Sequence, residues 1–149
     1  FTDVRLKRFL EMRGADAGSV EMMVAQSALW VGILYDPAAL AAARALVASR
    51  PWTEFAALRP LVPRTALDTR LAGDSGGTVR DLAREMVAIA GDGLRARAMR
   101  DAEGRDESVH LAPLEALAAG GPTQAERWLQ RYHGAWRGDT SRIFAEAAI

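Results

Sequence analysis

The sequence predicts a mainly α-helical domain, with one β-strand at its N-terminal end followed by about six helices. Residues 4–13 alternate between the two sides of a strand, whereas most of the remaining chain repeats apolar residues every three or four positions, as helices do. Residues typical of helix starts and stops separate these segments. With 149 residues, 50% of them hydrophobic, the chain can bury one ordinary core, and residues 1–149 show no internal repeat or domain boundary.

The predicted strand, "VRLKRFLEMR", has one largely apolar face and one charged face. One side carries Leu6, Leu10 and Met12 together with Arg8. The other side carries charges of both signs, on Arg5, Lys7, Glu11 and Arg13, together with Phe9. A lone strand has nothing to pair with. We therefore expect the rest of its sheet to lie elsewhere, with this chain as the C-terminal portion of a longer protein. Pairing with another copy is the alternative.

The first helix is expected from Ser19, as N-cap, to about Tyr35. It is apolar on nearly all sides, which predicts a buried helix with Trp30 and Tyr35 in the core. Asp36 as N-cap and Pro37 at the first helical position predict a second helix through the alanine-rich stretch that follows.

Two capping boxes mark later helices. Thr78 with Asp81 begins a long helix that is expected to reach about Arg100, and Thr123 is followed by Glu126 at the same spacing. Residues 64–77 are expected to form a loop. The helices after the second are predicted near 53–62, 78–100, 112–119, 124–133 and 141–147.

Composition excludes several classes of function. Lys plus Arg number 19 and Asp plus Glu number 19, so no net charge attracts nucleic acid or an anionic membrane. The chain contains no cysteine, which excludes disulfides, zinc–thiolate sites and a thiol nucleophile. No apolar run approaches the roughly 18–20 residues that span a bilayer. The first residues do not resemble a signal peptide, and we expect a cytoplasmic protein.

The string "GDSGG" at 73–77 surrounds the nucleophilic serine in chymotrypsin-like proteases. A triad also needs a base that is held by a third group, yet His110 and His133 both follow Ser75, and the string runs into a helix capped by Thr78. A glycine-rich loop at a helix start can bind phosphate, and Arg80 in the first turn faces either phosphate or solvent. No Walker lysine follows, so we favour a capped turn and do not take Ser75 as a nucleophile.

A family resemblance begins at "RLKRFLEMRGADAG" (5–18), which is similar to the glutamate–cysteine ligases of proteobacteria and plants. It continues through four further strings in the same order, "ALWVGILYD" (28–36), "GGTVRDLAREMVAIAGDGL" (76–94), "GRDES" (104–108) and "RYHGAW" (131–136). The chain resembles the C-terminal third of such an enzyme. The N-terminal part, which carries most of the nucleotide and glutamate site, has no counterpart in these 149 residues. After "RGAD" the family usually continues with Gly-Pro-Trp and basic residues, whereas this chain reads "AGSVEMMVAQ".

The resemblance implies an α+β carboxylate–amine ligase with a glutamine-synthetase-like fold. Such an enzyme uses ATP and Mg²⁺ to phosphorylate the γ-carboxylate of glutamate, and the amine of cysteine then displaces phosphate, which is the first step of glutathione biosynthesis. By position in the matching motif, Glu11 is the expected metal ligand and Arg13 the catalytic, nucleotide-phosphate contact. On a strand the two would project from one face, roughly 7 Å apart at the backbone. Implied partners are glutamate, cysteine and the N-terminal remainder of the enzyme, with no nucleic acid and no membrane.

Other interpretations stay open at this point. Glu11 and Arg13 also fit a solvated strand face with an ion pair, Asp16 fits a turn or cap, and His110 and His133 fit structural roles. The chain as a whole also fits a non-catalytic α-helical interaction module, or a γ-glutamyl ligase that uses another amine. In each case we expect the isolated 149-residue chain to lack ligase activity.

Overall fold

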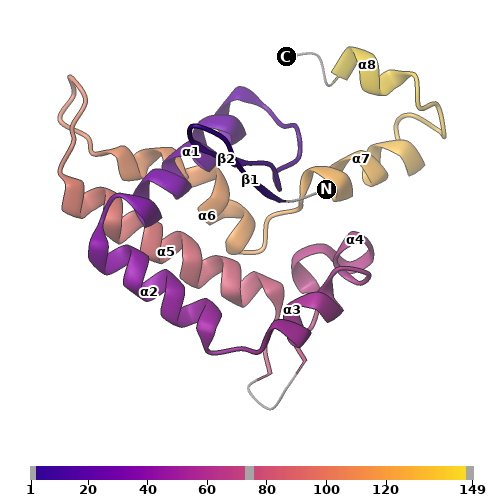
Figure 1. Cartoon of the computed structure of the whole chain (residues 1–149). Coiled ribbons are helices and arrows are strands. Elements are labelled where there is room, and N and C mark those ends of the chain that lie inside the picture. Colours follow the sequence, from indigo (N-terminus) through magenta and orange to yellow (C-terminus); the bar gives the residue numbers. More distant parts are fainter. Residues whose placement is uncertain (1–2, 73–75, 147–149) are drawn as a thin grey trace.

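The computed structural model describes residues 3–72 and 76–146, and it confirms a mainly α-helical chain with β-structure at its N-terminal end. Helices α1, α2, α5 and α6 form the body of the molecule (Figure 1). The elements in chain order are β1 (Val4–Leu6), β2 (Leu10–Met12), α1 (Val20–Leu34), α2 (Pro37–Ala48), α3 (Trp52–Leu58), α4 (Val62–Thr65), the 3₁₀ turn η1 (Ala66–Asp68), α5 (Val79–Arg97), the 3₁₀ turn η2 (Glu107–Leu111), α6 (Ala112–Ala118), α7 (Gln124–His133) and α8 (Arg142–Glu146).

The core lies where α1 crosses α5, with α2, η2 and α6 around the crossing. Leu94 and Leu111 are its largest fully buried side chains. Glycines allow the two long helices to touch at the backbone. A Cβ added to Gly32 would overlap the carbonyl oxygen of Ala90, and one added to Gly93 would overlap the carbonyl oxygen of Gly32. The crossing is therefore closer than any larger residue at these positions permits.

The four capped helix starts are those predicted from the sequence. At the first residues of α1, α2, α5 and α7, a side chain accepts a hydrogen bond from a backbone N–H of the first turn: Ser19, Asp36, Thr78 and Thr123. Thr78 and Thr123 each form a complete capping box, with Asp81 and Glu126 respectively. These local side-chain bonds satisfy N–H groups that a helix leaves unpaired, which is why sequence alone locates them.

Three helix boundaries differ from expectation. The helix predicted near 53–62 ends, as α3, at Leu58. The predicted loop 64–77 contains the end of α4 and the turn η1, because Pro63 lies in the first turn of α4, where its missing N–H is not needed. Helix α5 ends at Arg97 rather than about Arg100. Ala98 takes a left-handed conformation there, with φ 54°.

The N-terminal segment is not the single strand predicted over residues 4–13. It folds back on itself as an antiparallel hairpin, with Val4 opposite Met12 and Leu6 opposite Leu10. The reversal occupies Lys7–Phe9, where the Lys7 N–H donates to the Phe9 carbonyl oxygen at 2.9 Å. This turn contains no Gly, Pro, Asn or Asp, so the usual sequence signal for a hairpin is missing.

The expectation that α1 is buried on all sides is wrong. One face packs on α5, but Val20, Met23, Val24 and Leu34 are exposed, because no other described element covers the opposite face. Tyr35, expected in the core, is 69% exposed, and its ring lies 5.3 Å from the Arg97 guanidinium carbon. Trp30, also expected there, is half-buried.

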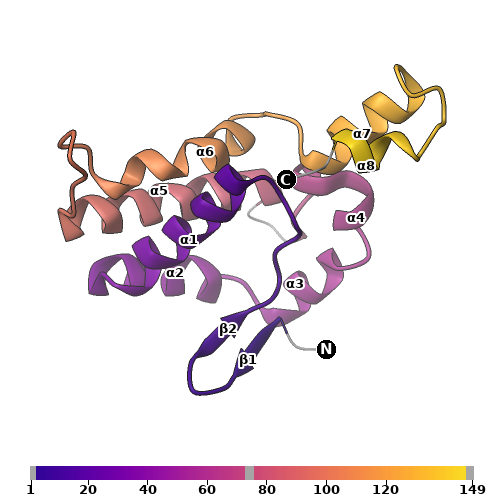
Figure 2. The same ribbon diagram turned by 90° about the horizontal axis from the view of Figure 1, so that it is seen from above.

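Helices α7 and α8 form an arm that extends away from the helical body (Figures 1 and 2). The arm has its own small core. Trp136 is 6% exposed and stacks on Trp128 with 5.5 Å between ring centroids. Its Nε1–H donates to the Glu146 carboxylate at 2.7 Å, and Arg131 pairs with the same carboxylate.

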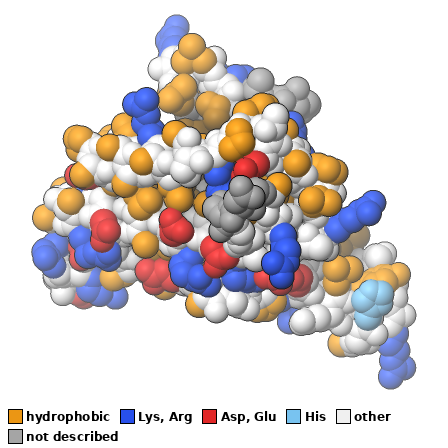
Figure 3. All heavy atoms as spheres, turned by 90° about the horizontal axis from the view of Figure 1, so that it is seen from below, with side chains coloured by type: hydrophobic (Ala, Val, Ile, Leu, Met, Phe, Trp, Pro, Cys, Tyr) orange, Lys and Arg blue, Asp and Glu red, His pale blue; other side chains and the backbone are white. Residues whose placement is uncertain are grey.

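The surface carries no block of one charge on the face shown in Figure 3, where acidic and basic side chains alternate. This mixture agrees with the formal net charge of zero. Within residues 3–72 and 76–146, no single helix is both long enough and apolar enough to cross a bilayer. Helices α1 and α2 meet that test only as a pair, and the chain bends by 97° between them.

Candidate functional site: the charged face of the hairpin

The hairpin separates apolar and charged side chains onto opposite faces. Its register sets Arg5 directly across from Glu11, and the neighbouring pairs, Val4 with Met12 and Leu6 with Leu10, belong to the other face because side chains alternate along each strand. Sequence reasoning placed Arg5 and Glu11 six residues apart on one strand. Folding back makes them cross-strand neighbours, so Arg5 joins the candidate site as a residue that the sequence prediction missed.

Glu11 and Arg5 form an ion pair on the charged face. The Arg5 Nε donates to the Glu11 Oε2 at 2.6 Å, and the two side chains are 44% and 31% exposed. A pair this accessible contributes about 0–1 kcal/mol to stability. A carboxylate also offers about four acceptor positions. Glu11 can therefore bind a cation while it still accepts a hydrogen bond from Arg5.

Arg13 continues the extended segment just beyond β2. Its backbone N–H donates to the Asp3 carbonyl oxygen at 2.8 Å, which extends the antiparallel pairing by one step past Val4 and Met12. Because Arg13 follows Glu11 by two residues, strand alternation places both on the same side. The hairpin thus brings the Glu11 carboxylate and two guanidinium groups to one face, and Asp3, opposite Arg13, adds a second carboxylate at its open end.

These residues fit part of a magnesium–phosphate site. Mg²⁺ prefers carboxylate and water oxygens and commonly takes one or two carboxylates from a protein, and arginine offers a planar fork of donors to phosphate oxygens. Within the described part of the chain, no three His, Cys, Asp or Glu side chains form a group that could hold a metal ion. Glu11 would therefore be one ligand among others supplied from elsewhere.

Asp16 lies in the extended loop between β2 and α1, and Ser19 rather than Asp16 caps α1. This loop lines a cavity of about 520 Å³ beside the hairpin. The cavity also contacts Gln26 and Trp30 of α1 and Gln124 of α7. The hairpin residues in its wall are Asp3, Val4 and Met12, so the cavity lies beside the apolar face and the open end of the hairpin.

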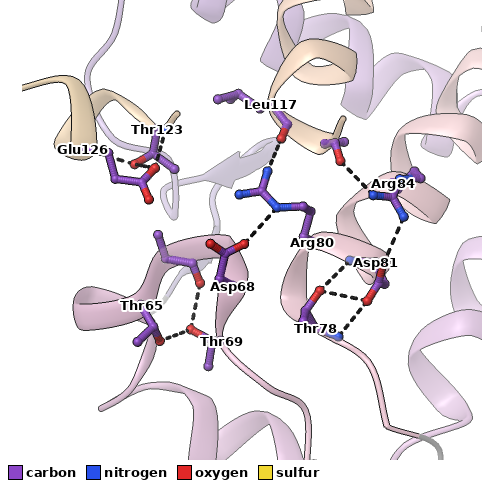
Figure 4. A network of polar contacts seen from close by, with 12 residues as sticks. Thr65, Asp68, Thr69, Thr78, Arg80, Asp81, Arg84, Leu117, Thr123 and Glu126 are labelled. Atoms are coloured by element: carbon purple, nitrogen blue, oxygen red, sulfur yellow. Dashed lines mark hydrogen bonds and ion pairs between the residues drawn. The ribbon is translucent and has the colours of Figure 1, made fainter. Parts of the chain in front are cut away.

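A second polar cluster joins η1, α5 and α6 (Figure 4). The Arg80 Nε donates to Asp68 Oδ1 at 3.0 Å, and its Nη1 donates to the Leu117 carbonyl oxygen. Arg84 Nη2 donates to the Ala118 carbonyl oxygen at 3.2 Å. The Arg80 side chain is only 14% exposed, so the solvent-exposed interpretation is wrong. Both arginines instead satisfy carbonyl groups at the C-terminal end of α6.

Ser75 lies outside the described residues, so the prediction that it is no nucleophile stays a prediction. The described part of the glycine loop agrees with a capped turn. Thr78 donates from both its N–H and its hydroxyl to Asp81 Oδ2, at 2.8 Å each. A carboxylate therefore already occupies the first turn of α5, where a phosphate would have to bind. His110 lies in η2 and His133 ends α7, so neither belongs to the hairpin.

Several acidic caps have lowered pKa values. Hydrogen bonds from the Thr78 hydroxyl and N–H lower the pKa of Asp81, and bonds from the Thr123 N–H and hydroxyl lower that of Glu126. Bonds from the Ser108 hydroxyl and N–H likewise lower the pKa of Asp106. In each case, hydrogen-bond donors at a helix cap stabilise the charged carboxylate. These shifted pKa values therefore reflect helix capping and do not mark a catalytic site.

Comparison with known proteins gives a consistent result. Residues 1–146 match the family described as Glutamate-cysteine ligase family 2 (GCS2). The chain is 39% identical over 148 residues to the chloroplastic glutamate–cysteine ligase of Medicago truncatula, covering 98% of this chain and 27% of that protein. It is 38% identical over 146 residues to chloroplastic ligase A of Oryza sativa subsp. indica (98% and 28%), and 37% identical over 146 residues to the chloroplastic enzyme of Arabidopsis thaliana (98% and 26%).

No solved structure matches the chain at a significant level. The chain spans about a quarter of the length of these plant relatives. Their names place them in chloroplasts, whereas a cytoplasmic location stays a prediction for this chain. Because the family match covers nearly every residue, the chain belongs to glutamate-cysteine ligase family 2.

Proposed function

We propose that this chain is the C-terminal portion of an ATP-dependent ligase that joins the γ-carboxylate of glutamate to the amine of cysteine, the first step of glutathione biosynthesis. The observation that carries the proposal is the family match over residues 1–146, which includes the charged hairpin. Relatives that are named glutamate–cysteine ligases share 36–39% identity with almost the whole chain. The remaining part of the enzyme would carry the rest of the substrate site.

The charged face of the hairpin suits the chemistry of phosphoryl transfer. A phosphoryl group in transfer spreads negative charge over its oxygens, and catalysis consists mainly of positioning it and neutralising that charge. ATP with Mg²⁺ would supply the phosphoryl group that activates the glutamate carboxylate. In this assignment Glu11 is a ligand of the magnesium ion, and Arg13 donates to the phosphate oxygens.

Arg5 has a positioning role in the same proposal. Its Nε holds Glu11 Oε2 at 2.6 Å, which fixes the rotamer of the carboxylate on an exposed strand. The guanidinium also adds positive charge next to the expected phosphate. An arginine that holds a metal-binding carboxylate restricts where the metal can lie, so its removal should alter magnesium dependence before it alters folding.

The test is turnover by the intact ligase polypeptide, measured as phosphate release from ATP with glutamate and cysteine present, over a range of magnesium concentrations. Glu11→Gln keeps the shape of the side chain and removes its charge, so magnesium-dependent turnover should weaken strongly. Arg13→Lys cannot reproduce bidentate phosphate contact, and the rate should fall on the order of 10³-fold.

Matched controls come from an ion pair far from the hairpin. Arg105 donates to Glu103 at 3.2 Å in an exposed loop, so Glu103→Gln and Arg105→Lys make the same chemical changes without touching the proposed site. Thermal melting of all four variants separates activity from folding. Near-wild-type rates and magnesium dependence in well-folded Glu11→Gln and Arg13→Lys variants would show that the hairpin is scaffold.

A further inference from the structure

Helix α7 carries a row of polar and aromatic side chains along one face, the α7 row: Gln124, Arg127, Trp128 and Arg131. Spacings of three, one and three residues place all four on the same side of a helix. No residue of α7 is buried, and of these four only Trp128 packs on another aromatic ring, that of Trp136. The row therefore presents one amide, two guanidinium groups and one indole ring that the packing of the helical body does not require.

The α7 row forms one wall of a cavity of about 580 Å³. The opposite wall comes from the loop before α1 and from the first turn of that helix, with Gly18, Val20 and Met22. Small-molecule sites usually measure about 300–1,000 Å³ and combine apolar walls with a few polar groups. The space between the arm and the start of α1 therefore has the size and the lining of a ligand site.

The wall of this cavity carries more positive than negative charge. Two of its described side chains are guanidinium groups, and one, Glu146, is a carboxylate. Glu146 pairs with Arg131 and accepts the Trp136 indole N–H, so its charge is already used within the arm. No described residue forms an ion pair or a hydrogen bond with the side chain of Arg127. Among the described residues, the cavity therefore keeps one uncompensated cation, which favours an anionic ligand.

We propose that this cavity binds a nucleoside phosphate, with the phosphate on Arg127 and the base against Trp128. Arginine offers phosphate oxygens a planar fork of donors, and aromatic rings stack on nucleic-acid bases regardless of their identity. Gln124 lies one turn before these two residues, and its amide can both donate to and accept from the edge of a base. The row thus supplies one contact to the phosphate and two to the base.

This site goes beyond the proposed function, in which the phosphates of ATP lie at the charged face of the hairpin. Glu11 and Arg13 are not part of the cavity wall. A nucleotide in the cavity would contact the arm on one side and the start of α1 on the other, so it would hold the arm against the body. The cavity is therefore a second nucleotide site, apart from phosphoryl transfer.

The test is the binding of AMP, measured by isothermal titration calorimetry without magnesium, glutamate or cysteine. It uses both the 149-residue chain and the intact ligase polypeptide, so that the intact polypeptide gives the answer if the shorter chain does not fold. Arg127→Gln should weaken AMP binding at least about tenfold, because a charge-assisted contact to phosphate is lost. Adenosine and inorganic phosphate each make only part of the contacts and should bind at least about tenfold more weakly than AMP.

Arg137→Gln is the matched control, since Arg137 lies between α7 and α8 but lines no part of the cavity. Arg13→Gln tests the hairpin as the other place where a nucleotide could bind. Both variants should bind AMP as the wild type does, and thermal melting establishes that all variants fold. AMP binding that is absent, or that is lost in Arg13→Gln and kept in Arg127→Gln, overturns the inference. So does inorganic phosphate that binds as tightly as AMP, because the indole ring then contributes nothing.

The outcome is separable from that of the proposed function, since AMP binding needs no turnover. Binding that depends on Arg127 in an inactive polypeptide would support the second site and count against the ligase assignment. An active ligase whose AMP binding is the same in wild type and Arg127→Gln would do the reverse.

Discussion

Two glycines determine how closely α1 and α5 approach each other. Gly32 and Gly93 lie where the helices cross, and the Cβ of an alanine at either position would overlap a backbone carbonyl oxygen of the other helix. Backbone atoms cannot rotate away as a side chain can. Any substitution here has to separate two helices that carry most of the core.

Gly93→Ala should therefore destabilise the chain, by about 1–3 kcal/mol or more. Gly91→Ala is the control in the same helix. Its Cβ would meet only the flexible end of Arg95, at 3.3 Å, and alanine is favoured over glycine in a helix by about 1 kcal/mol. Urea denaturation should show a lower midpoint for Gly93→Ala and an unchanged or higher one for Gly91→Ala. Equal midpoints would mean that the helices can move apart at little cost.

Acid should weaken the fold through carboxylates that act as caps. Asp106 caps η2, and donors from Ser108 lower its pKa below the ordinary value of 3.8. A group whose pKa is lowered on folding stabilises the native state above its unfolded pKa, and this contribution is lost as pH falls through the folded value.

Asp106→Asn should reduce this loss, because asparagine keeps an oxygen that can accept the cap bonds but has no charge to titrate. The measurement is the melting temperature of wild type and variant between about pH 5 and pH 3. The wild-type curve should fall more steeply with acid than the variant curve. Parallel curves would show that protonation of Asp106 contributes nothing to acid unfolding.

Some of these residues were predictable from the sequence and others were not. The caps at Thr78 and Thr123 could be predicted, because a capping box joins residues three positions apart and depends on nothing else. The pairing of Arg5 with Glu11 was not, since it depends on a chain reversal at residues 7–9 that lacks turn-forming residues. The side on which Glu11 and Arg13 lie was predictable from alternation alone.

The positions of the helices along the chain could be predicted more reliably than the burial of their faces. The capped starts of α1, α2, α5 and α7 follow from local signals, but the burial of α1 depends on which elements cover it. Apolar residues on all sides indicate that a helix is covered in the complete protein. They do not indicate whether the covering elements belong to the same segment, which is why Tyr35 was expected in the core and is exposed.

The α7–α8 arm depends on a single large side chain. Trp136 is buried between Trp128 and α8, and its indole N–H holds Glu146. Because α7 has no buried residue of its own, little else fixes α8 against it.

Trp136→Ala should therefore loosen the arm alone, since truncating a buried tryptophan costs about 3–5 kcal/mol. Amide hydrogen exchange within 124–146 should quicken by at least about tenfold, while exchange within α5 stays as in wild type. Phe144→Ala is the control, because Phe144 belongs to the same arm and is 82% exposed. Faster exchange in α5 as well would show that arm and body unfold together.

As a whole, the described molecule is a helical layer with a hairpin on one side. Its charged face offers Glu11, Arg5 and Arg13, yet no described group of three acidic or histidine residues could hold a metal ion. A phosphoryl-transfer site needs further ligands and a place for the acceptor. In the proposed assignment, the segment therefore supplies part of the site.

The isolated 149-residue chain should accordingly lack ligase activity. The assay is phosphate release from ATP in the presence of glutamate, cysteine and magnesium, with circular dichroism to establish that the helices have formed. Turnover comparable to that of the intact enzyme would contradict the division of the site between this segment and the rest of the polypeptide.

The loop of the hairpin has a consequence for how such a sequence can diverge. Strand faces alternate with a period of two, so inserting or deleting one residue within Lys7–Phe9 would shift the register and turn β2 over. Glu11 would then point toward α1, and Leu10 and Met12 would point toward the solvent. The register depends on the number of residues in the loop and little on their identity. We therefore expect natural variants to tolerate amino-acid substitutions in this turn but to conserve its length.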